Sequence, residues 1–230
     1  MIEIDHICLG SGNFWEASHK LTEETGLGNI EGGWFPDFRL ANRIVPTGND
    51  TYIEVEGVID AHAIERGNPV AKFFHDSTRD GDCFIGWCAR VDSREELEAV
   101  ARRLGTEIFE GTMKKAPDGS MGYTARTPDT AQCWMAGLPN FFFTPDRSKH
   151  SGRLKPTNGT KVPTRIAWME LGGTKAEMDH WLGCDSDTLG LRFNGKAAGL
   201  YAMGIETETG MVEIHRPVLS GTTGKISQTA

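Results

Sequence analysis

Three short segments of this chain carry side chains that could bind a metal ion or move a proton. The first is the apolar stretch of residues 2–10, in which His6 would share one strand face with Ile4 and Cys8. A neutral imidazole is a good ligand for Zn, Fe, Ni or Mn. On periodicity alone, however, a hydrogen-bonded core histidine is the commoner explanation.

The second segment places two carboxylates on one strand face. Glu54 and Glu56 alternate with Ile53 and Val55, which gives an acidic face and an apolar face. A solvated acidic face is the usual meaning of this pattern. The alternative is a strand that lines a cavity, where one carboxylate binds a cation and the other serves as a base.

The third segment repeats this alternation near the end of the chain. Glu213 and His215 alternate with Val212 and Ile214. They form a second pair that could act, with Glu213 as a base and His215 as a metal ligand. This strand could meet His6 within one chain or across a homodimer.

Composition restricts the class of protein. The 230 residues include 32 acidic and 24 basic side chains, a net charge of -8, which disfavours binding to nucleic acid or to an anionic membrane. No apolar run approaches the ~20 residues that span a bilayer, and the start has no signal-peptide pattern. The five cysteines are scattered, without a C-x-x-C pair, which indicates reduced thiols and a cytoplasmic location.

A unit of strand, capped helix and glycine stop recurs three times. The helices are predicted to begin after Asn13, Ser93 and Thr174, each followed three residues later by Glu, and to end at Gly26, Gly105 and Gly183. The caps are 80 and then 81 positions apart, which indicates tandem copies of one supersecondary unit. Two or three strand-like segments follow each helix. We therefore predict an α+β fold of tandem βαβββ modules, with curved, mostly antiparallel sheets and helices on the outer side.

The predicted modules divide the chain into four parts. Residues 1–145 would form a domain of two modules, and residues 146–163, rich in Lys, Gly, Ser and Pro, a linker. A third, partial βαββ module would occupy 164–218, and 219–230 would be a tail.

The chain resembles the vicinal oxygen chelate superfamily, and within it the glyoxalase-like domain family. The residues that carry the resemblance are Asp5-His6, a Gly32-Gly33 turn, the segment 42–45 (NRIV), Tyr52-Ile53-Glu54 and a P-D-G turn at 117–119. It covers roughly residues 1–145. The chain departs from the family at Trp34 and Phe35, where a further histidine is usual.

The resemblance implies a divalent metal ion (Zn, Fe, Ni or Mn) held by His6 and Glu54, with His215 as a further candidate ligand. Glu56 and Glu213 are the candidate catalytic bases. Four polar residues sit on segments that would line the substrate cavity, although surface charge on a strand explains them equally well: Arg39, Asn42, Tyr123 and Arg126.

Two functions follow from these expectations. The first is a metal-dependent lyase, isomerase or dioxygenase that acts on a small oxygenated metabolite. The alternative is a metal-free protein of the same fold that binds or sequesters small molecules, an option favoured by the missing histidine.

Overall fold

Twelve strands form two sheets in the computed structural model, which describes residues 1–217 apart from the side chains of 112–115. The first eight strands are β1 (Glu3–Gly10), β2 (Ile30–Phe35), β3 (Leu40–Gly48), β4 (Thr51–Val58), β5 (Cys83–Arg90), β6 (Phe109–Lys115), β7 (Met121–Thr127) and β8 (Asn140–Phe143). The other four are β9 (Pro163–Leu171), β10 (Leu191–Phe193), β11 (Leu200–Thr207) and β12 (Gly210–His215). The predicted tail, 219–230, and residue 218 lie outside the described residues.

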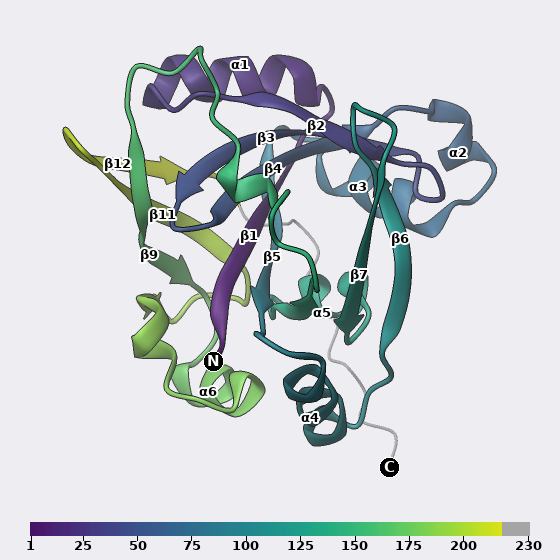
Figure 1. Ribbon diagram of the computed structural model, residues 1–230, viewed down its shortest axis with the longest axis vertical. Coiled ribbons are helices and arrows are strands. Elements are labelled where there is room, and N and C mark those ends of the chain that lie inside the picture. The colour runs from purple at the N-terminus through teal and green to yellow at the C-terminus, as the bar shows by residue number, and fades with distance from the viewer. Residues whose placement is uncertain (218–230) are drawn as a thin grey trace.

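The first eight strands close into a barrel in the order β1-β4-β3-β2-β6-β7-β8-β5 (Figure 1). In each of the two modules the first strand pairs parallel with the last, as β1 with β4 and β5 with β8, while the other pairs are antiparallel. This confirms the predicted α+β architecture of curved, mostly antiparallel strands. The third unit has a different sheet order, β10-β9-β11-β12, in which β9 lies between β10 and β11.

The three predicted helices form where their caps place them. They are α1 (Phe14–Thr25), α4 (Arg94–Leu104) and α6 (Lys175–Leu182). Each capping side chain accepts the backbone N–H of the glutamate three residues on, and each helix ends at a glycine with positive φ. The full reciprocal capping box forms at Thr174, where the Glu177 carboxylate also accepts the Thr174 N–H.

Several short elements were not predicted from the sequence. They are α2 (Ala61–Glu65), α3 (Pro69–Ser77), α5 (Thr130–Met135), η1 (Ser151–Arg153) and η2 (Ser186–Leu189). The expected turn at Gly32-Gly33 is also wrong, because both glycines lie inside β2, at a register shift between Glu31 and Trp34. A Cβ on Gly32 would collide with the side chain of Asn42, so glycine is needed for this close approach.

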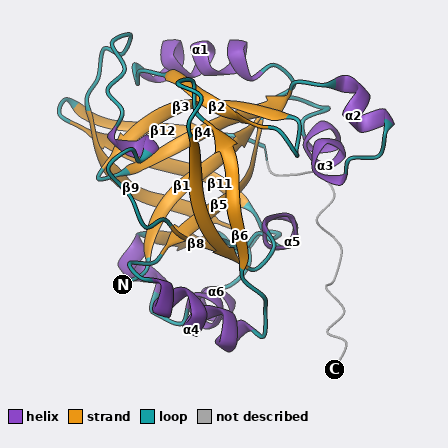
Figure 2. Ribbon diagram, turned by 45° about the vertical axis from the view of Figure 1, so that its right-hand side comes forward, coloured by secondary structure: helices purple, strands orange, loops and turns teal. Residues whose placement is uncertain are grey.

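The two faces of the barrel wall pack against different partners. The outer face, which includes Ile7 and Ile53, shares one apolar cluster with α1, α4 and the second sheet. In Figure 2 the strands of the two sheets lie between α1 on one side and α4 with α6 on the other. The inner face carries Cys8 and Cys88, which cluster with Phe74 of α3 and Trp134 of α5.

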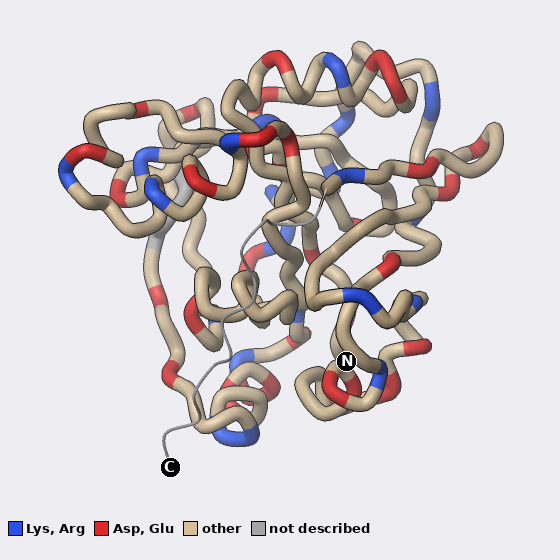
Figure 3. The backbone as a smooth tube through the Cα atoms, turned by 180° about the vertical axis from the view of Figure 1, so that it is seen from behind, with Lys and Arg blue, Asp and Glu red and all other residues tan. Residues whose placement is uncertain are grey.

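Charged residues of both signs are interspersed along the chain path (Figure 3). Within residues 1–217, none of the helices combines the length and apolar composition that a bilayer crossing would need.

Candidate metal and catalytic site

A β-bulge in β1 brings Asp5 and His6 together. The register of β1 against β5 shifts between Ile4 and His6, which leaves Asp5 as the extra residue. In a regular strand neighbouring side chains point to opposite faces. Here the Asp5 Oδ2 atom lies 2.7 Å from His6 Nδ1. The bulge therefore lets a carboxylate orient the imidazole that follows it.

His150 completes a buried network around Asp5. It comes from the predicted linker, and its Nε2 atom lies 3.1 Å from Asp5 Oδ1. The side chain of His150 is 7% exposed. The sequence did not single out His150, because it lies in a segment without periodic apolar residues.

The hydrogen bonds assign the protonated nitrogens of this network. The Gly152 N–H donates to His150 Nδ1, so that His150 carries its proton on Nε2 and donates it to Asp5. Burial by itself would raise the pKa of Asp5, but the hydrogen bonds from His150 and His6 outweigh it and lower this pKa well below its usual range. Asp5 is thus a carboxylate that accepts from both imidazoles, and the lone pair of His6 lies on Nε2.

Glu54 lies on the side of His6 that carries this lone pair. β1 and β4 run parallel, with Cys8 opposite Glu54 and His6 opposite Tyr52, so these side chains share the inner face. The distance from His6 Nε2 to Glu54 Oε2 is 3.9 Å. This is too long for a hydrogen bond. It is short enough for both atoms to contact one ion at about 2.0–2.2 Å.

Aromatic rings fix the plane of the His6 imidazole. The Tyr52 ring stacks on it at a centroid distance of 5.0 Å, and the Phe142 ring meets it edge-on at 5.5 Å. Burial raises the pKa of the Tyr52 hydroxyl well above its usual value, with a further contribution from the Glu54 and Asp5 charges. Tyr52 is therefore a neutral phenol at physiological pH, and it excludes water from one face of His6.

Glu56 and Asn42 lie one step further along the same face. The Cys8 thiol donates to Glu56 Oε2 at 3.1 Å. Asn42 is the register partner of Glu56 across β3 and β4. Its Oδ1 accepts the Gly33 N–H, while its buried Nδ2 makes no hydrogen bond within the described residues. An orphaned buried donor beside a carboxyl group suits a ligand oxygen.

The third predicted pair lies elsewhere. Glu213 and His215 are exposed on β12, 3.4 Å from each other, in the second sheet. Their strand neighbours Val212 and Ile214 point the other way, into the core. Within the described part of this chain, the structure does not bring Glu213 or His215 to His6 and Glu54.

The remaining predicted pocket residues are divided between both sides of the barrel. Arg126 pairs in register with Phe142, the residue that contacts His6. Tyr123 is 39% exposed and donates to Glu110, which in turn binds Arg94 of α4, so it lies on the outer side. Arg39 was expected on a strand, but it lies in the turn between β2 and β3.

Two side chains of this site could occupy coordination positions of a divalent ion. His6 offers Nε2, Glu54 offers Oε2, and Asp5 supplies the carboxylate behind the imidazole that metal-binding histidines commonly have. Among the described residues no group of three or more His, Cys, Asp or Glu side chains is arranged around one ion. The protein would thus supply two ligands, and water or substrate the others.

The family model for the glyoxalase-like domain matches residues 4–183, which is 180 of the 230 residues. The chain belongs to this family. The match extends past residue 145, through the segment that holds His150 and as far as the end of α6. No curated protein matches the sequence.

Three solved structures are examples of what this chain is similar to. The crystal structure of a hypothetical protein from Staphylococcus aureus is 11% identical, with a TM-score of 0.58 over 96% of this chain and 88% of that one. Methylmalonyl-CoA epimerase from Mycobacterium tuberculosis is 13% identical, with a TM-score of 0.44 over 62% and 86%. A mutant of 4-hydroxymandelate synthase from Streptomyces coelicolor is 13% identical, with a TM-score of 0.47 over 92% and 61%. The family match confirms the glyoxalase-like domain that the sequence predicted.

Proposed function

We propose that this glyoxalase-like protein is a metal-dependent enzyme, a lyase, isomerase or dioxygenase, that acts on a small oxygenated metabolite. His6 and Glu54 would hold a divalent ion, one of Zn, Fe, Ni or Mn. One observation carries the proposal: the lone pair of His6 Nε2, fixed by Asp5, lies 3.9 Å from Glu54 Oε2 on a buried strand face. Two acceptor atoms at that separation are compatible with a shared cation.

The residues of the chain would divide the chemistry among them. A bound divalent ion supplies a Lewis acid for adjacent substrate oxygens. Asp5 keeps the His6 proton on Nδ1, and Tyr52 shields one face of the ring. Glu56 would hold a substrate proton on Oε2, the atom that the Cys8 thiol contacts in the free protein. Asn42 would donate its free Nδ2 hydrogen to a substrate oxygen.

Metal analysis of purified variants tests the two ligands. We expect His6→Ala and Glu54→Ala to lose the divalent metal that the wild-type protein retains, as measured by mass spectrometry of the elements after dialysis. His180→Ala and Glu23→Gln are matched controls, because both side chains are exposed. Metal content that stays at the wild-type level in both His6 and Glu54 variants would falsify the assignment.

A second candidate function is metal-free binding of a small molecule in the same interior. It is favoured by Trp34 and Phe35, two aromatic residues of β2 at the position where the family usually has a histidine. Wild-type protein that contains no metal, and takes up none when Zn, Fe, Ni or Mn is supplied, would select this alternative.

The homodimer and the cytoplasmic location stay predictions from the sequence. Sedimentation equilibrium measures the first directly. If a dimer forms, the exposed pair on β12 is the part of the predicted site that could reach a partner subunit.

A further inference from the structure

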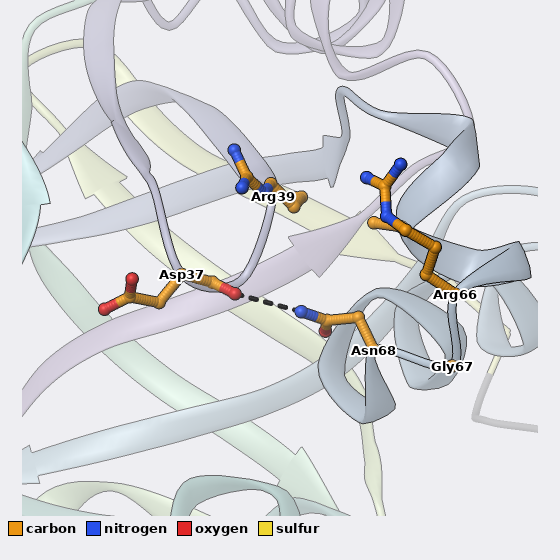
Figure 4. Close-up of a pocket in the computed structure, with 6 residues that line it drawn as sticks. Asp37, Arg39, Arg66, Gly67 and Asn68 are labelled. Atoms are coloured by element: carbon orange, nitrogen blue, oxygen red, sulfur yellow. Dashed lines mark hydrogen bonds between the residues drawn. The ribbon is translucent and has the colours of Figure 1, made fainter.

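A polar cavity of about 380 Å³ lies at the joint between the β2–β3 turn and the α2–α3 pair. Two arginines line it, Arg39 from the β2–β3 turn and Arg66 from the connection between α2 and α3. In Figure 4 the guanidinium groups of Arg39 and Arg66 lie apart from each other, and the carboxylate of Asp37 points away from both. The full lining is Asp37, Arg39, Ala63, Arg66, Gly67 and Asn68.

Arg39 occupies a backbone conformation that favours glycine. Its φ is 58°, in the left-handed region that non-glycine residues seldom adopt. Backbone hydrogen bonds hold it there, since its N–H donates to Phe35 O and its carbonyl accepts from Ile59 N, both at 2.9 Å. Glycine would fill this position at lower cost, so the arginine brings a side chain at the expense of stability.

The second arginine is held in place by its own neighbours. Arg66 binds Asp60 through Nη2 at 2.8 Å. Asn68 joins the two sides of the cavity, because its Nδ2 donates to Asp37 O at 2.9 Å. Asn68 also caps α3, a helix of nine residues, where its Oδ1 accepts the N–H groups of Val70 and Ala71. Arg39 forms no ion pair within the described residues, which leaves its charge available.

We propose that this cavity binds the phosphate group of a small metabolite. Arginine presents a planar fork of donors that matches phosphate oxygens, and Arg66 keeps N–H donors beyond the one that binds Asp60. The cavity is larger than a phosphate and admits part of the molecule that carries it. None of its lining residues is a candidate metal ligand, so this site goes beyond the proposed function and does not depend on it.

Titration with inorganic phosphate, followed by calorimetry on the purified protein, tests the proposal. We expect Arg39→Gly and Arg66→Ala each to weaken phosphate binding by about tenfold or more, the loss typical of a hydrogen bond to a charged group. Arg79→Ala, an exposed arginine outside the cavity, is the control and should bind as the wild type does. Arg39→Gly should also melt at the same or a higher temperature, because glycine relieves the left-handed backbone.

Three results, besides the one for His6→Ala given below, would overturn the phosphate site. They are no binding by the wild type at millimolar phosphate, unchanged binding by Arg39→Gly, and acetate binding as tight as phosphate. The variant His6→Ala separates this proposal from the metal site. Its phosphate affinity should equal that of the wild type even when its metal is lost, and a loss of both would show that phosphate binds at the metal instead.

Discussion

One carboxylate orients two imidazoles in this protein. Asp5 accepts from His6 on one oxygen and from His150 on the other, and all three side chains are buried. Because both carboxylate oxygens of Asp5 are hydrogen-bonded, burial of its charge is tolerable. Asp5 has no proposed role as a metal ligand or base. It nevertheless decides which nitrogen of His6 faces Glu54.

The exchange of Asp5 for Asn tests this role at the scale of a single residue. An amide offers one acceptor oxygen, and its NH2 group would oppose one of the two imidazole N–H groups. We expect Asp5→Asn to lower metal affinity about 10–100-fold, the usual effect of losing an outer partner of a ligand. Chelator competition measures the affinity, and ¹⁵N NMR of the imidazoles reports the tautomers.

A structural role alone would give a different result for this variant. Stability in urea would fall, but the His6 tautomer and the metal affinity of the remaining folded protein would be those of the wild type. The sequence could suggest Asp5-His6 through the family motif, whereas His150 stands in a segment without periodicity. No local signal marks a histidine whose partner is 145 positions away.

At the scale of elements, the three helices that have a glutamate three residues after the capping residue could be predicted to the residue, and the other helices could not. Asn13, Ser93 and Thr174 are capping residues followed by an apolar periodicity, and each helix ends at a glycine. α2 and α5 have five and six residues, too few to show a helical repeat. Gly32 and Gly33 of β2 were predicted to form a turn. The reason for a glycine at position 32 is the close approach of Asn42 on the next strand, which the local sequence does not show.

The joint between α6 and η2 carries a pH-dependent contact. Hydrogen bonds from Lys175 and then Ser186 lower the pKa of Asp179 from 3.8 to about 2. A depressed carboxyl pKa stabilises the folded state above the unfolded value, and this contribution is lost as the pH falls from about 4 through about 2. We expect Asp179→Asn to melt below the wild type at pH 7 and to approach it at pH 2.5.

The contact is exposed, so the difference should be small and should shrink in high salt. Thermal melts at the two pH values, at low and at high salt, measure it. A melting difference between Asp179→Asn and wild type that stays constant from pH 7 to pH 2.5 would contradict the assignment of the shift to Asp179.

At the scale of the whole molecule, the second sheet and its helix cover the barrel rather than extend it. β9 and β11 share the apolar cluster of the outer barrel wall. Arg103 of α4 donates to the backbone carbonyls of His180, Trp181 and Leu182 at the end of α6. The sequence predicted three similar units, but it could not show how they pair, because the sheet order depends on contacts between distant strands.

The cysteines report whether the barrel interior opens. Four are buried, namely Cys8, Cys83, Cys88 and Cys133, whereas Cys184 is partly exposed. Burial raises the pKa of each buried thiol, that of Cys83 to about 11, so few thiolates exist at pH 8. With a thiol reagent such as a disulfide dye, we expect one fast equivalent from Cys184 and four slow ones.

The slow equivalents should react only when the inner face of the barrel becomes accessible, so their rate should rise in step with unfolding as urea is added. Cys184→Ser is the control, and it should remove the fast equivalent alone. Three or more fast thiols in the Cys184→Ser variant would include Cys8 or Cys88, and would mean that the wall carrying these two residues opens in the native protein. In that case His6 and Glu54, which share this wall, would also meet solvent, and the buried site would have to be replaced by an open one.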